Sequence, residues 1–91
     1  MRIEFPMPEV EERCRLWQLH LPPTVPQAAD LDLPAIAERY RMSGAYIRNA
    51  AMRAAFLAVA EHRPVSADLV LRAIELEYHE AGKLAATGTL Q

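Results

Sequence analysis

The residues best suited to chemistry lie in the stretch SGAYIRN, residues 43–49. Ser43 is a favourable helix N-cap, and Gly44 leaves room for a ligand or another backbone to come close. The helix that follows presents free N–H groups and a positive dipole at its N-terminus, and Arg48 lies one turn further on. Such a corner suits an anionic or nucleotide ligand. The spacing alone favours a simpler interpretation, in which the glycine only suits the turn and the arginine is a solvated charge, because motif fragments this short occur by chance.

A second interpretation of this region is a helix-turn-helix that presents a recognition helix to DNA. Asn49 and Arg53 fall on one side of the expected helix, where they could pair with adenine and with guanine or phosphate. Beyond them, Met52, Phe56 and Val59 continue the same general side with apolar residues. A helix that is apolar nearly all round is buried on more than one face, so the pattern favours a central packing helix.

The remaining candidate groups indicate no second site. The histidines His20, His62 and His79 are dispersed over three segments without metal-ligand spacing, so no metal is predicted. Cys14 has no base nearby in the sequence and is interpreted as a small core residue. A single cysteine cannot form an intramolecular disulfide, so a reducing compartment, the cytoplasm, is expected.

The composition is that of one ordinary globular domain. The chain has 91 residues, of which 52% are hydrophobic and 24% charged, and this balance excludes a disordered polymer. The net charge of −2 gives no electrostatic footprint for phosphate backbones, so nucleic acid is not the expected partner. No apolar run approaches the roughly 20 residues of a membrane helix, so no membrane partner is expected either.

The pattern of apolar residues and helix signals predicts an all-α fold: four helices preceded by a short extended arm or orphan strand over residues 1–8. The proline-rich residues 22–30 are expected to form an ordered loop. A strand such as RIEF needs partners, so the arm is expected to link to a sheet that lies upstream of this sequence in a larger protein. The helix signals are Pro8 and Pro22 at the two ends of the first helix, the N-caps Asp32, Ser43 and Ser66 of the other three, and Gly82 as the C-cap of the last.

Four segments occur in an informative order: FPMPEVEERCRLW, DLDLPAIAERY, MSGAYIRNAAMRAAFLA and VSADLVLRAIELEYHEAGK. Their order and spacing resemble those of the C-terminal helical lid subdomain of an AAA+ ATPase, over about residues 2–83. The resemblance implies a four-helix lid-type bundle over residues 9–82, with residues 83–91 as a frayed tail. The arm of residues 1–8 would connect the lid to the nucleotide-binding core.

The resemblance also implies roles for particular residues. Gly44 and Ala45 match the pair that lies against the adenosine part of a bound nucleotide. Many AAA+ lids have their sensor-2 arginine near the position of Ala45, whereas this chain has Arg48 instead. Phe5 and Pro8 match the exit from the last core strand, and Arg13, with the apolar pair Leu16 and Trp17, matches the first lid helix. The nucleotide-binding residues implied are therefore Gly44, Ala45 and Arg48, and the residues implied for contact with the core or a partner are Phe5, Pro8 and Arg13.

The chain contains no G-x-x-x-x-G-K-[ST] phosphate loop, so it is not expected to transfer phosphoryl groups by itself. The resemblance implies that ATP or ADP binds through a parent protein and that no cofactor binds the isolated chain. Its partners would be the upstream AAA+ core and the neighbouring subunit of a ring. The alternatives that remain are the helix-turn-helix DNA-binding domain and a free-standing helical adaptor.

Overall fold

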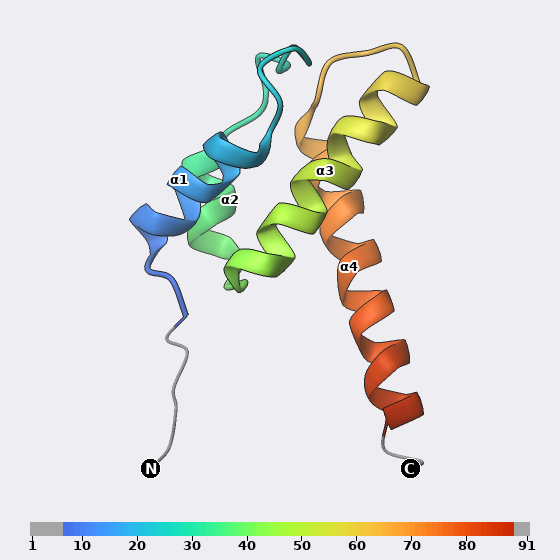
Figure 1. Cartoon of the computed structure of the whole chain (residues 1–91). Helices are drawn as coiled ribbons and strands as arrows, with labels where there is room; N and C mark the ends of the chain where they lie inside the picture. The colour runs from blue at the N-terminus through green and yellow to red at the C-terminus, as the bar shows by residue number, and fades with distance from the viewer. Residues whose placement is uncertain (1–6, 89–91) are drawn as a thin grey trace.

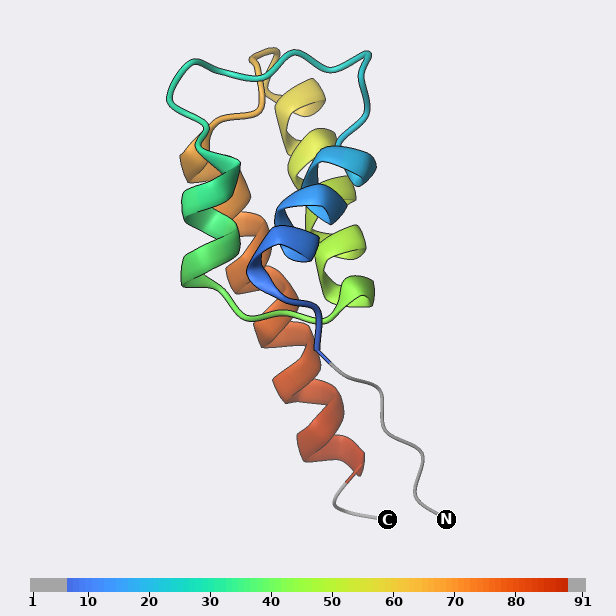
Figure 2. The same cartoon turned by 90° about the vertical axis from the view of Figure 1, so that its left-hand side faces the viewer.

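The computed structural model describes residues 7–88, with backbone only for residue 81 and residues 83–88. In this part of the chain the structure is all-helical, as predicted (Figure 1). Figure 2 shows the two short helices lying across the two long ones. The helices are α1 (Val10–His20), α2 (Leu33–Arg39), α3 (Gly44–Ala60) and α4 (Ala67–Gly88).

Local side-chain caps determine where the middle helices begin. The Asp32 carboxylate accepts a hydrogen bond from the Ala35 amide at 3.1 Å at the start of α2. The Ser43 hydroxyl accepts one from the Tyr46 amide at 3.3 Å at the start of α3. Each oxygen satisfies one of the backbone donors that a helix N-terminus leaves free. Both predicted N-caps are thus confirmed.

The end of α4 differs from the prediction that Gly82 is its C-cap. A glycine ends a helix when its backbone turns left-handed, but no glycine in the described chain has a positive φ. Gly82 instead continues the helix, which extends to Gly88. The segment expected to fray from residue 83 is therefore helical as far as Gly88, and residues 89–91 lie outside the described part.

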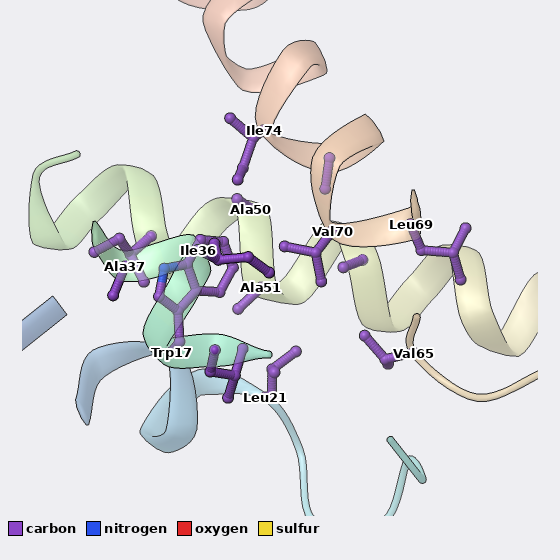
Figure 3. Close-up of a cluster of buried hydrophobic side chains, with 14 of the residues drawn as sticks. Trp17, Leu21, Ile36, Ala37, Ala50, Ala51, Val65, Leu69, Val70 and Ile74 are labelled. Atoms are coloured by element: carbon purple, nitrogen blue, oxygen red, sulfur yellow. The ribbon is translucent and has the colours of Figure 1, made fainter. Parts of the chain in front are cut away.

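The core is centred on Trp17 of α1, which is fully buried. Figure 3 shows its indole lying among Ile36 and Ala37 of α2 and Ala51 of α3. One face of α3 is made of small residues, and they let α1 and α4 pack against it closely. The fully buried alanines of this face are Ala50, Ala51, Ala54 and Ala58.

The other side of α3 corrects the expectation that this helix is buried on more than one face. Met52, Phe56 and Val59 are 59%, 73% and 62% exposed, respectively. Among the helices of the described part, α1 and α4 are the two that contact α3. The alanine side of α3 is buried, as predicted for a central packing helix. The apolar pattern did not reveal that the side with Met52, Phe56 and Val59 is exposed in this domain.

The connector of residues 22–30 is attached to the turn between α3 and α4. The Ala28 amide donates to the Val65 carbonyl at 2.8 Å, and the Val65 amide donates to the Pro26 carbonyl at 2.9 Å. These bonds form an isolated parallel bridge between Gln27 and Val65. Figure 1 shows both segments at the same end of the molecule. The proline-rich segment is therefore held in place by backbone bonding, as expected of an ordered loop.

Charged side chains close the α3–α4 turn. Arg63 donates from Nη2 to Asp68 Oδ2 at 2.9 Å and from Nε to Glu61 Oε1 at 2.9 Å. Arg72 donates to the second oxygen of Glu61 at 3.1 Å. The Arg63 guanidinium, with a hydrogen bond from Ser66, lowers the pKa of Asp68 from 3.8 to about 2. The ionised form of Asp68 is thus favoured in the folded protein.

This shift gives a testable pH dependence. Because the folded pKa of Asp68 lies below its unfolded value, its contribution to stability is complete above pH 4 and is lost as the pH falls from about 4 to about 2. Asp68→Asn should lower the free energy of unfolding at pH 7 and lower it much less at pH 2, as measured by urea unfolding at both pH values. Asp30→Asn is the control, because Asp30 makes no hydrogen bond or ion pair within residues 7–88. An equal loss for Asp68→Asn at both pH values would contradict the assignment.

A second prediction follows from the helical conformation of Gly82. A Cβ atom added there would meet no other atom within 4 Å, so alanine fits without strain. Gly82→Ala should raise the free energy of unfolding by about 0.5 to 1 kcal/mol, because alanine loses less backbone entropy in a helix. Urea unfolding measures the change. A destabilised Gly82→Ala variant would show that the helix breaks at this residue.

Candidate functional site

The N-terminal end of α3 contains all three predicted nucleotide-binding residues. Gly44 is the first residue of the helix and is half-buried, while Ala45 and Arg48 are exposed. Arg48 follows Gly44 by four residues, so the two lie on neighbouring positions of one helix face. Within residues 7–88, Arg48 makes no hydrogen bond or ion pair. Its guanidinium is therefore open to a ligand.

The local structure does not require a glycine at position 44. Its backbone has no positive φ, and a Cβ atom built there would lie 3.7 Å from Leu16 Cδ1, which is ordinary van der Waals contact. Any small residue would satisfy the fold at this point. The glycine therefore leaves a part of the surface open beside the helix N-terminus, where backbone N–H groups face outward.

A hollow of about 370 Å³ lies beside Gly44, between the start of α1 and the start of α3. Pro8 lies in its lining, so the structure brings one residue predicted for the arm next to one predicted for nucleotide binding. The acidic groups of this lining, Glu9 and Glu12, can accept hydrogen bonds from hydroxyl or amino groups and would repel phosphate. The hollow is lined by Met7, Pro8, Glu9, Glu12, Leu16 and Gly44.

The sequence analysis did not identify Glu9 and Glu12 as part of a site. A usable indication exists in their spacing. Glu9, Glu12 and Leu16 follow one another at three- and four-residue intervals, which places them on one face of the helix. The spacing alone does not show that Gly44 lies close to this face of the helix.

Arg13 has an internal structural position. Its side chain is 4% exposed, its Nε donates to the Ala37 carbonyl at 2.7 Å, and its Nη1 donates to the Pro8 carbonyl at 2.7 Å. The guanidinium thus joins α1 to α2 and to the segment before α1. The predicted contact of Arg13 with a core domain or partner stays a prediction, and Phe5, predicted for the same role, lies outside the described residues.

The surroundings of Asn49 and Arg53 disfavour the DNA-binding alternative. Asn49 is exposed, but Arg53 Nη2 lies 3.4 Å from Glu77 Oε1 and is partly neutralised by it. Glu77 and Glu80 line the same hollow as the two residues that would read bases. Carboxylates at that place repel a phosphate backbone, so the local electrostatics oppose binding.

The described residues show no other site of known type. Among residues 7–88, no group of three or more histidine, cysteine or acidic side chains could hold a metal ion. Within the same part of the chain, no helix is both long enough and apolar enough to cross a membrane. The helix N-terminus with Gly44 is therefore the main candidate.

A comparison with known families gives the class of protein as an ATPase-associated helical domain. Residues 9–86 match the model of the contractile injection system ATPase helical domain, and the chain belongs to this family. No curated protein matches the sequence. The family supports the predicted association with an ATPase and does not itself specify an AAA+ lid.

The internal role of Arg13 gives a prediction about stability. Arg13→Ala leaves the Ala37 and Pro8 carbonyls without their donors and empties a buried site, so we expect a loss of about 2 to 4 kcal/mol in the free energy of unfolding. Arg13→Lys should lose less, because one donor can be retained. Urea unfolding compares these variants with Arg15→Ala, whose side chain is exposed on the same helix. A loss for Arg13→Ala no larger than that of Arg15→Ala would contradict this role.

Proposed function

We propose that the domain is the lid of an AAA+-type ATPase, which contacts the base and ribose side of a nucleotide and couples ATP binding and hydrolysis to subunit movement. The observation that carries the proposal is Gly44. The fold tolerates a Cβ atom there, yet the chain keeps an open surface at a helix N-terminus, next to a hollow and an exposed arginine. Membership in a family of ATPase helical domains supports it independently.

Different residues around the hollow suit different parts of a nucleotide. Glu9 and Glu12 suit hydrogen-bond donors such as ribose hydroxyls or the adenine amino group, and Leu16 offers an apolar surface to the base. Phosphates would lie away from these carboxylates, on the side of Arg48 and the α3 N-terminus. In the complete ATPase, Arg48 is the candidate for the sensor-2 arginine that contacts the phosphates.

In this proposal, ATP hydrolysis takes place in an upstream core, because the chain contains no phosphate loop. ATP or ADP is then bound through the parent protein, in the cytoplasm. The domain moves with the nucleotide state and passes that movement to a neighbouring subunit of a ring. The family name, which refers to a contractile injection system, supports assembly with other subunits.

Nucleotide titration of the domain joined to its upstream core tests the proposal. Gly44→Val should weaken nucleotide binding about tenfold, equivalent to about 1.4 kcal/mol, because its methyl groups occupy the open surface beside α3. Arg48→Ala should weaken binding of ATP more than binding of adenosine. The matched control is Gly82→Ala, which changes a helical glycine with nothing near it.

Circular dichroism and urea unfolding confirm that each variant keeps its fold. The isolated 91-residue chain should hydrolyse no ATP. Turnover by that chain, or unchanged nucleotide affinity in Gly44→Val, would overturn the proposal. Salt-dependent binding of the chain to duplex DNA that is lost in Asn49→Ala would favour the helix-turn-helix instead.

A further inference from the structure

A second surface, distinct from the Gly44 hollow, lies on the side of α3 that faces away from the core. Met52, Phe56 and Val59 follow one another at four- and three-residue intervals, so they form one continuous apolar face. All three are more than half exposed. Single exposed apolar residues are common, but an ordered row of three in a small domain indicates a surface that another molecule covers.

The structure also shapes this surface. An open hollow of about 580 Å³ lies between α3 and α4, and its lining combines apolar and charged side chains. Met52 and Phe56 supply the apolar part, and Arg53 and Glu77 make an ion pair beside them. The hollow is lined by Asn49, Met52, Arg53, Phe56, Glu77 and Glu80.

We propose that this α3–α4 groove docks a protein segment that carries an apolar side chain together with a lysine or arginine. The apolar side chain packs against Met52 and Phe56, and the cation meets the carboxylate of Glu80. The charge of the groove selects this partner, because the lining contains two carboxylates and one guanidinium. An incoming cation balances the excess negative charge, and an amphipathic helix laid in a groove is a common way to present both groups.

The same charges disfavour other occupants. Nucleic acid and anionic membranes would bring phosphates against Glu77 and Glu80. A second copy of this chain, docked through the same face, would add its own excess of carboxylates to the contact. The groove does not involve Gly44, Ala45 or Arg48, so this proposal goes beyond the nucleotide contact and stands or falls separately from it.

Two synthetic amphipathic helical peptides test the groove. Both carry the same row of leucines, and one has lysines beside this row where the other has glutamates. Titrated into the ¹⁵N-labelled 91-residue chain, the lysine peptide should shift the amide signals of residues 49–59 and 77–80. Its binding should be about fivefold tighter than that of the glutamate peptide, which corresponds to the upper range for an exposed ion pair. Glu80→Lys should reverse this preference.

Phe56→Ser should weaken binding of the lysine peptide about tenfold or more, because the apolar contact of one large side chain is lost. Its high exposure means that the substitution leaves the core intact. Val10→Ser is the control, since Val10 is exposed on α1 and does not line the groove. Equal affinity for both peptides, shifts elsewhere on the domain, no binding, or sedimentation of the peptide-free chain as a Phe56-dependent dimer would each overturn the proposal.

Discussion

Ala50, Ala51, Ala54 and Ala58 form a fully buried face along α3, and the two helices that pack on α3, α1 and α4, depend on it. Alanine side chains add little thickness to a helix, so α1 and α4 can both approach the α3 backbone. In a tightly packed interior, even one added methylene group disturbs the packing of its neighbours. The alanine face thus sets two distances at once: that from Gly44 to the first helix, and that from Arg53 to Glu77 on the last.

Much of the fold could be predicted because its determinants are local. Asp32 and Ser43 cap helices through bonds to residues three positions away, and proline marks the ends of α1 without reference to the rest of the chain. Gly82 shows where local reasoning fails. A glycine is compatible with a helix end and a helix interior, and the described backbone continues as a helix through it.

The candidate site was only partly predictable for the same reason. The spacing of SGAYIRN and the family resemblance indicated Gly44, Ala45 and Arg48, but the hollow beside them needs α1 in place. Arg13 bonds to the carbonyl of Ala37, 24 residues away, and no local pattern encodes that contact. The prediction that the apolar side of α3 is buried was wrong for a different reason. Hydrophobic spacing shows that a face will be covered, and it does not show which molecule covers it.

Two attachments fix separate parts of the chain, and they lie at opposite ends of the domain. Arg13 fastens α1 to α2 near the Gly44 end, and the bridge between Gln27 and Val65 fastens the proline-rich connector to the α3–α4 turn at the other (Figure 1). A body clamped at both ends bends little between them. Bonds at both ends oppose bending of the domain between them, so we expect a displacement of the end beside the hollow to displace the far end as well.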